Sequence, residues 1–415
     1  MESECLTVVM EEKRQNRIGI ITMYYNSSNY GGLLQAYALC KYLNDSGYPT
    51  KQITYDFYRK TISSSKDYKN LVSFLFKRLQ KRTNNLIIKT INIIHGVSEL
   101  RKDRRNICAE FRASIPHTET VYNDNSIEDC NNLFDIFIAG SDQVWNPDVF
   151  RPSFFLSFVN EEKKKISYAA SIGNSITGKE MQSEYEDALN KFDRISVREK
   201  SDINKLEDLC KKRVEWVVDP VFLLTEKQWE TVSSPVQLNI NKEYIFCYFL
   251  GDDKRHREIA QKVAKMCNCA IVTIPYMQMN YRKCDSKFGD EKLLDLTPAQ
   301  FLYLVKNAKG IFTDSFHATA FSIIFNKWFI TFGRTDHPRM NERITSITSL
   351  YNCGDRCVLD YSDDVVQRIF DKCPLTTNCR YESQKALQLI GRSKEFLLSI
   401  GLMARPWREY YVRDS

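Results

Sequence analysis

The residues of this sequence best suited to chemistry lie in the turn Asp314-Ser315-Phe316-His317. The apolar residues before it suit a buried strand, and those from Ala318 to Phe325 recur at helical spacing. The turn therefore lies at the carboxyl end of a strand, where open α/β sheets bind ligands. Free N–H groups and the positive helix end favour an anion there, beside a histidine that titrates near neutral pH. In a plainer interpretation, Asp314 and Ser315 only cap the helix and His317 is an ordinary turn residue.

Two arginines are predicted at the ends of other buried strands. Arg198 follows the apolar segment that begins at Phe192, and Arg334 follows Trp328–Phe332. A guanidinium at a strand end can bind a carboxylate or phosphate through two parallel hydrogen bonds. The alternative for Arg198 is a surface ion pair with Glu199.

Polar residues also follow three strands predicted near 17–23, 134–140 and 165–172. They lie at the carboxyl ends of these strands, so we expect them to line a ligand cleft. The tryptophan among them either offers a flat face to a sugar ring or belongs to the core. The glycines at 31 and 32 belong either to a ligand-facing loop or to a plain connection that needs positive φ. The residues are Asn29, Gly31, Ser141, Asp142, Trp145 and Ser171.

The elements that position these residues alternate between strand and helix in two series, separated by a polar stretch near 233–242. A chain of 415 residues with 43% apolar and 27% charged residues is expected to form two folded domains. We predict an α/β protein with two Rossmann-like domains facing across a cleft. The predicted parts are a polar leader (1–16), an N-terminal domain (17–235), a C-terminal domain (243–381), and a helix with a tail (382–415).

Residues 66–115 alternate apolar and strongly basic side chains at roughly helical spacing. Basic amphipathic helices bind anionic membrane surfaces, so peripheral membrane contact through this insertion is one interpretation. The other is the solvated face of helices that pack on the domain. No apolar run reaches the length of a membrane span, and the N-terminus has no signal-peptide core, so a cytoplasmic location is expected.

Charge and cysteine usage exclude several kinds of function. Thirteen cysteines, an odd number, predict reduced thiols, and their spacing lacks the paired motifs of a zinc site. A net charge of +7 is modest for this length, and no nucleic-acid-binding module accompanies it. We therefore expect neither a metal site nor a nucleic-acid partner.

Six stretches, in order, resemble the polysaccharide pyruvyl transferase family. They begin at Asn29-Tyr-Gly-Gly, Phe137-Ile-Ala-Gly-Ser-Asp-Gln, Ser167-Tyr-Ala-Ala-Ser, Ile195-Ser-Val-Arg-Glu, Val218-Asp-Pro-Val and Thr313-Asp-Ser-Phe-His. The resemblance implies a GT-B-like fold with the site between the domains. It implies transfer of pyruvate from phosphoenolpyruvate to two hydroxyls of a sugar, with a cyclic ketal and phosphate as products. It also implies capsule or exopolysaccharide synthesis at the inner face of the cytoplasmic membrane, where the acceptor can be lipid-linked.

The resemblance places Arg198 and His317 near the donor. Ser315 stands where the better-studied pattern of the family has an arginine, and we expect Arg334 to replace that residue. His317 is expected to transfer protons with Asp314 as its orienting partner, and the scheme needs no cofactor. Two other functions remain open: a GT-B-type glycosyltransferase that uses a nucleotide sugar, and a non-catalytic saccharide-binding homologue.

Overall fold

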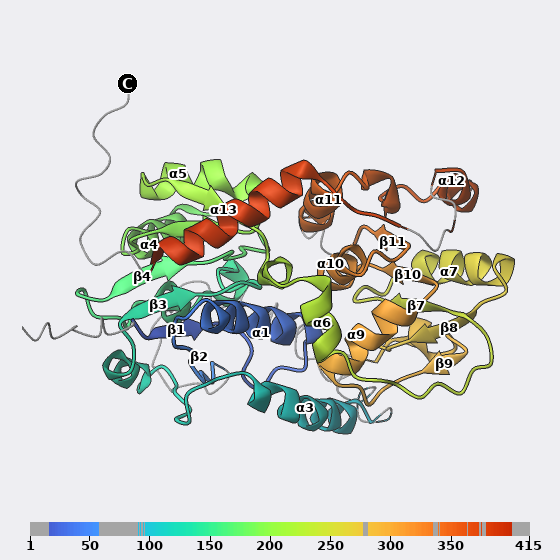
Figure 1. The fold of residues 1–415 in the computed structure, drawn as a ribbon, viewed down its shortest axis with the longest axis horizontal. Coiled ribbons are helices and arrows are strands. Elements are labelled where there is room, and N and C mark those ends of the chain that lie inside the picture. The colour runs from blue at the N-terminus through green and yellow to red at the C-terminus, as the bar shows by residue number, and fades with distance from the viewer. Residues whose placement is uncertain are drawn as a thin grey trace, which may run out of the picture.

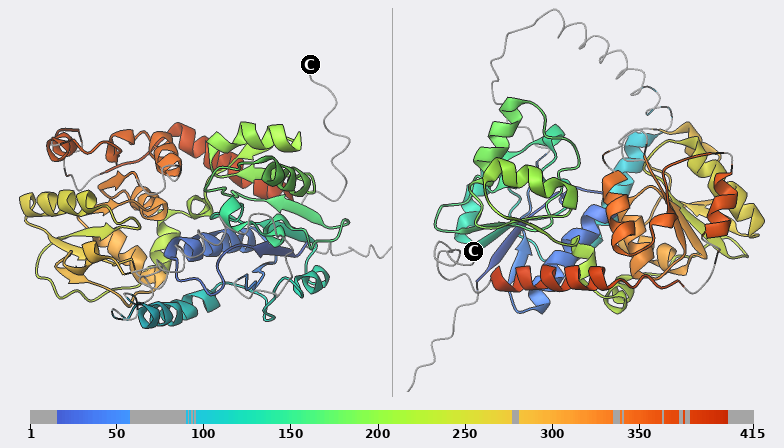
Figure 2. Two further views of the ribbon diagram at one scale, coloured as in Figure 1. Left: turned by 180° about the vertical axis from the view of Figure 1, so that it is seen from behind. Right: turned by 90° about the horizontal axis from the view of Figure 1, so that it is seen from above.

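The computed structural model describes residues 16–57, 90, 92, 94, 96–276, 281–334, 339, 341–362, 364–372, 375 and 379–400. Two parallel β-sheets, each packed between helices, lie side by side (Figures 1 and 2). The predicted α/β class with two Rossmann-like units is confirmed, although the exact domain bounds stay a prediction. No helix in the described ranges is long and apolar enough to cross a membrane.

The N-terminal sheet has the strand order β2-β1-β3-β4. It continues into β5 and β6 through parallel bridges between Ile166 and Arg194 and between Ala170 and Val197. All pairings are parallel, so the carboxyl ends of the strands share one edge. The strands are β1 (Ile18–Ile21), β2 (Thr50–Gln52), β3 (Ile136–Ala139), β4 (Lys164–Ser167), β5 (Ile195–Val197) and β6 (Val214–Trp216). The helices of this half are α1 (Tyr30–Asp45), α3 (Val97–Ser114), α4 (Lys179–Leu189), α5 (Ile203–Cys210) and α6 (Glu226–Val232).

The C-terminal sheet has the order β12-β11-β10-β7-β8-β9, again all parallel. The strand order reverses between β7 and β10, and such a switch point opens a crevice for a ligand. The strands are β7 (Tyr244–Tyr248), β8 (Ala270–Thr273), β9 (Glu291–Lys292), β10 (Gly310–Thr313), β11 (Phe329–Phe332) and β12 (Cys357–Val358). The helices are α7 (Lys254–Met266), α8 (Lys283–Ser286), α9 (Pro298–Asn307), α10 (Phe316–Ile324), α11 (Asn341–Leu350) and α12 (Val365–Lys372).

The last helix, α13 (Gln384–Ile400), crosses back to the N-terminal half, as the red helix in Figure 1 shows. The backbone N–H of Val218 donates to the Ser393 hydroxyl at 3.0 Å. Arg194 donates to the Ser399 hydroxyl at 2.6 Å, and its guanidinium lies 3.9 Å from the centre of the Phe396 ring. These contacts tie the end of the chain to the first sheet.

Apolar contacts close one end of the boundary between the halves. Tyr30 at the start of α1 packs against Phe301 of α9 at 5.3 Å between ring centres. Trp229 of α6 meets Phe321 of α10 edge to face at 4.9 Å. Aromatic pairs of this kind add to the free energy of burial, so the two halves share an apolar core.

Helix α1 begins at Tyr30, so both glycines lie in its first turn. The side chain of Asn29 caps it by accepting from the N–H groups of Gly31 and Gly32. The two glycines are helical and have no positive φ, so the plain connection considered for them is wrong. Both positions leave little room for a side chain. A Cβ on Gly31 would lie 2.0 Å from Nδ1 of His317, and a Cβ on Gly32 would lie 3.3 Å from Oδ2 of Asp142.

Most of the basic stretch 66–115 lies outside the described residues. Its last part, α3, is a helix as predicted and contacts α9 of the other half. Arg105 is exposed, whereas Arg104 is buried with only 3% of its surface exposed. The described part of this stretch is therefore a helix that packs against the C-terminal half on one side and is exposed to solvent on the other.

Candidate active site between the two sheets

His317 lies in the first turn of α10 and faces the N-terminal half. Ser315 is the N-cap of this helix, and its hydroxyl accepts from the N–H of Ala318 at 3.4 Å. The imidazole is buried against α1, where a Cβ added to Gly31 would lie 2.0 Å from Nδ1. The histidine of the C-terminal half thus fills the space that Gly31 leaves in the N-terminal half.

Asp219 is the carboxylate nearest to His317. It follows β6, and its Oδ2 lies 3.8 Å from Nε2 of the imidazole, which has no hydrogen-bond partner. Asp219 is itself held firmly: Oδ2 accepts from the Ser141 hydroxyl at 3.1 Å, and Oδ1 accepts from the N–H of Val221. This pair joins a fixed carboxylate to a histidine whose Nε2 is available to a substrate.

The buried guanidinium of Arg198 lies among three carboxylates. Nη1 donates to Asp219 at 2.6 Å, Nε donates to Glu199 at 3.0 Å, and Nη2 lies 4.0 Å from Asp142. Because Arg198 and Glu199 are 6% and 5% exposed, the surface ion pair considered for them is wrong. Nη2 has no hydrogen-bond partner and remains available for a ligand.

Glu199 connects this cluster to Arg343 of α11. Its Oε1 accepts from the Ser171 hydroxyl at 2.9 Å and lies 3.6 Å from Nε of Arg343. Arg343 is only 5% exposed, so a second guanidinium is held in the low-dielectric interior near Arg198. Ser171 and Ser141 are fully buried and hold carboxylates instead of lining an open cleft.

The backbone after β3 is strained where it delivers Asp142. Asp142 and Gln143 have φ values of 58° and 62°, a conformation that is uncommon outside glycine. The strain brings one oxygen of Asp142 to 3.5 Å from the Asn29 amide, while the other faces Arg198. Strained residues of this kind cluster at functional sites.

Trp145, predicted to line the cleft, has another role. It is fully buried, its ring centre lies 5.2 Å from that of Phe155 in a stacked arrangement, and it donates to the carbonyl of Phe154. It is a core residue, so the predicted contact with a sugar ring is wrong.

Asp314 does not face His317. Its oxygens accept from the N–H groups of Leu250 and Gly251 at 2.5 and 2.8 Å, and one lies 3.7 Å from Nδ1 of His256. Asp314 thus fixes the loop after β7, and the prediction that it orients His317 is corrected in favour of Asp219. Burial favours a raised pKa for Asp314, but the hydrogen bond and charge of His256 outweigh it and lower this pKa, and the charge of Arg334, on the same side, adds to the lowering.

Burial and charge set the proton affinities of the site. Burial and the charges of Arg198 and Arg343 lower the pKa of His317, while Asp219 and Asp142 oppose this shift. Burial favours a raised pKa for Asp219, but the charges of Arg198 and His317 outweigh it and hold this pKa below its usual range. At pH 7 the pair is therefore a neutral imidazole beside a carboxylate, which suits a proton acceptor.

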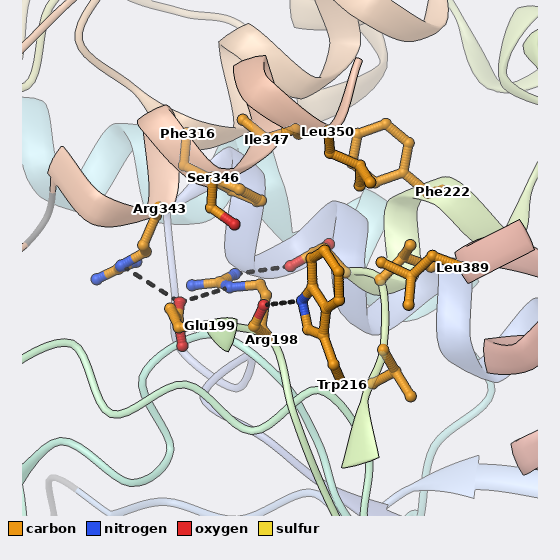
Figure 3. A pocket seen from close by; sticks show the side chains of 13 residues that line it. Arg198, Glu199, Trp216, Phe222, Phe316, Arg343, Ser346, Ile347, Leu350 and Leu389 are labelled. Atoms are coloured by element: carbon orange, nitrogen blue, oxygen red, sulfur yellow. Dashed lines mark hydrogen bonds and ion pairs between the residues drawn. The ribbon is translucent and has the colours of Figure 1, made fainter. Parts of the chain in front are cut away.

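Like-charge repulsion acts on Arg343. Burial and the nearby Arg198 lower the pKa of Arg343 to about 10. Figure 3 shows Arg198, Glu199 and Arg343 lining a cavity of about 30 Å³, with Leu389 on its other side and the Trp216 indole beside Arg198, to whose carbonyl it donates. Two cations held this close favour the arrival of an anion.

Asp219, Glu199 and Arg343 were not predicted as site residues. Asp219 follows a strand, so the strand-end rule that selected Arg198 could have found it. Arg343 lies inside a helix, and no spacing in the sequence indicates it.

Comparisons with solved structures support the fold. A UDP-N-acetylglucosamine 2-epimerase from Rickettsia bellii is 11% identical with a TM-score of 0.51, covering 94% of this chain and 96% of that chain. The S. aureus MnaA–UDP structure is 13% identical with a TM-score of 0.51, covering 92% and 97%. The UDP-GlcNAc 2-epimerase from Methanocaldococcus jannaschii is 10% identical with a TM-score of 0.50, covering 92% and 99%. These likenesses confirm the predicted GT-B-like fold.

A search of curated protein sequences finds no match. The sequence model of the polysaccharide pyruvyl transferases matches residues 29–337, which include α1, β3, Arg198 and the His317 turn. The match covers most of the chain and, of the site residues named above, leaves out only Arg343 and Leu389. This chain belongs to the polysaccharide pyruvyl transferase family.

Proposed function

We propose that this protein transfers pyruvate from phosphoenolpyruvate to two hydroxyls of a sugar, forms a cyclic ketal and releases phosphate. The observation that carries the proposal is the array of His317, Asp219 and Arg198 between the sheets of a chain that belongs to this family. It combines a proton acceptor with cations suited to a small, multiply charged anion.

Donor binding is assigned to Arg198, with Arg343 and Arg334 as supporting cations. Two nitrogens of Arg198 are held by Asp219 and Glu199, so its orientation is fixed before the ligand arrives and Nη2 is left to donate. An anion between Arg198 and Arg343 would relieve the repulsion that lowers the pKa of Arg343. Arg334 is proposed to replace the arginine absent at Ser315, whose hydroxyl caps α10 beneath the donor.

The reaction balances with two acceptor protons. When the first hydroxyl adds across the enol double bond, its oxygen bonds to C2 and one proton goes to C3, so that CH₂ becomes CH₃. Phosphate then leaves C2 with the proton of the second hydroxyl, whose oxygen closes the ring. We assign the proton transfers to His317, because the carboxylate of Asp219 stabilises the imidazolium that forms on each transfer.

The acceptor is proposed to be a sugar of a polysaccharide or of its lipid-linked precursor. Its side of the site would include Asn29, Gly31 and Asp142, which line the N-terminal face opposite His317. The basic stretch 66–115 would hold the enzyme at the inner face of the cytoplasmic membrane by attraction to anionic lipids.

A transfer assay tests this proposal. Purified protein is incubated with phosphoenolpyruvate and a panel of aryl hexosides, and both phosphate and the pyruvylated sugar are measured. We expect one phosphate per ketal, released only when a suitable acceptor is present. Release of nucleotide from a nucleotide sugar, with no phosphate from phosphoenolpyruvate, would assign the protein to the glycosyltransferases instead.

A further inference from the structure

Arg104 is a buried cation without a charged partner. It comes from α3, is 3% exposed, and takes part in no ion pair among the residues that the structure describes. The largest electrostatic influences on it come from Tyr30, Tyr248 and Cys108. Burial raises the pKa of Tyr248 to about 12 and that of Cys108 to about 11, so neither carries a charge at pH 7.

The free nitrogens of Arg104 form one edge of the guanidinium. Nε and Nη2 are both buried, and neither has a hydrogen-bond partner. These two N–H groups are the parallel pair that binds a phosphate or carboxylate with two hydrogen bonds. A buried charge with its bidentate edge unused costs free energy, which an anionic ligand would recover.

The position of Arg104 relates this edge to the candidate active site. Its guanidinium lies 4.3 Å from the centre of the Tyr30 ring, and Tyr30 is the first residue of α1. The next residue, Gly31, contacts His317. The positive end of the α1 dipole also lies here, which adds to the attraction for an anion.

Arg104 comes from α3 and lies against the Tyr30 ring, whereas Arg198 follows β5 and is held by Asp219 and Glu199. The surroundings of Arg104 are called the Arg104 flank below. On the Arg104 flank, the ring centre of Tyr248, at the end of β7, lies 6.2 Å from the ring centre of Tyr30. This flank is built from α1, α3 and β7, so both halves of the molecule form it.

We propose that Arg104 binds a phosphate group on the acceptor, as in a sugar carried by a diphosphate, and so brings the sugar hydroxyls to His317. This inference rests on the proposed function, because it assigns the second substrate of the same reaction. Arg104 belongs to the basic stretch 66–115. Because its guanidinium is buried, it cannot contact a membrane surface, and binding the acceptor would explain its charge.

The test uses Arg104→Gln and, as its matched control, Arg105→Gln on the exposed side of the same helix. Replacing an unpaired buried charge leaves no opposite charge stranded, so the variant is expected to fold. Three acceptors with one sugar are compared: a short-chain polyprenyl diphosphate sugar, a UDP-sugar and a neutral glycoside.

We expect Arg104→Gln to raise the KM of a diphosphate-linked acceptor roughly tenfold to hundredfold, the effect of lost charge-assisted hydrogen bonds. The KM values of the neutral glycoside and of phosphoenolpyruvate should not change, and Arg105→Gln should behave as wild type. The charged acceptor that shows the effect identifies the carrier as lipid or nucleotide. An unchanged KM for both charged acceptors, or an equal rise for the neutral glycoside, overturns the inference.

Calorimetry with inorganic diphosphate, without phosphoenolpyruvate, separates this inference from the proposed function. Binding by wild type and Arg105→Gln but not by Arg104→Gln supports the anion site even if no acceptor leads to phosphate release. Equal binding by all three proteins rejects Arg104 as its ligand, whatever the transfer assay shows.

Discussion

The imidazole of His317 occupies the space where a side chain at position 31 would stand, because a Cβ on Gly31 would lie only 2.0 Å from Nδ1. Position 31 is in α1 of the N-terminal half, and His317 is in α10 of the C-terminal half. A single missing methyl group thus lets the two halves close around the proposed catalytic histidine.

Gly31→Ala should therefore reduce turnover by displacing His317 or holding the halves apart. We expect kcat/KM to fall at least tenfold while the far-UV spectrum stays native. The matched control is Gly391→Ala in α13, where an added Cβ meets nothing within 4 Å and alanine should stabilise the helix by up to about 1 kcal/mol. Equal kcat/KM values for both variants would contradict the close approach.

His317→Gln should lower kcat by about 10²- to 10⁴-fold, the usual contribution of general acid–base catalysis. Phosphoenolpyruvate binding should persist, because the proposed donor cations remain. His117→Gln is the control, since that histidine pairs with Gln52 of β2 and its Nδ1 lies 2.7 Å from the carbonyl oxygen of Ile115. Turnover near that of wild type, with both substrates saturating, would remove His317 from the mechanism.

The pH dependence should report the neutral imidazole. Since the pKa of His317 is lowered from 6.5, a base that must be unprotonated stays active below pH 6.5 and loses activity as pH falls through its own pKa. Asp219 opposes the lowering, so Asp219→Asn should move the acid limb of kcat/KM to still lower pH. An acid limb that shifts upward in this variant contradicts the assigned pair.

Asp219→Asn should also destabilise the fold, because it leaves Arg198 without its closest carboxylate. Breaking a buried ion pair costs about 3–5 kcal/mol. The control is Asp135→Asn, whose ion pair with Arg17 is partly exposed. The losses in free energy of unfolding of the two variants, measured with urea, should differ by at least half that amount. Equal midpoints would show that Asp219 is not a structural partner of Arg198.

Asp314→Asn distinguishes the role of Asp314 from that of Asp219, the other carboxylate near α10. Asp314 accepts from two backbone N–H groups of the loop after β7, so the variant should lose about 1–3 kcal/mol of stability. The acid limb of its pH profile should stay where it is in wild type. A shift as large as that of Asp219→Asn would restore Asp314 as the orienting group.

The sequence indicates strand ends well and side-chain directions poorly. The apolar runs before Arg198 and His317 placed both at the correct edge, because parallel strands bring their carboxyl ends together. Asp314 was misassigned because its partners Leu250 and Gly251 come from another strand end. Trp145 was misassigned because the residue types around it do not indicate that its indole packs on Phe155 and donates to the carbonyl of Phe154.

Arg343 and Arg104 show what long-range packing adds. Both arginines are buried: Arg343 lies on a helix whose sequence indicates only an ordinary polar face, and Arg104 belongs to the basic stretch 66–115. Arg343 lies beside Arg198 and Glu199, which come from a distant segment, whereas Arg104 lies against Tyr30 and has no charged partner among the described residues.

The central claim is that phosphoenolpyruvate is the donor, and calorimetric titration of this compound tests it most directly. Wild type and the control Arg368→Gln, in an exposed ion pair, should show the same saturable binding. Arg198→Lys keeps the charge but loses the planar fork, and Arg343→Gln loses the second cation, so each should weaken binding at least tenfold. Absence of binding to wild type at millimolar phosphoenolpyruvate, or equal affinities in all four proteins, would contradict the account.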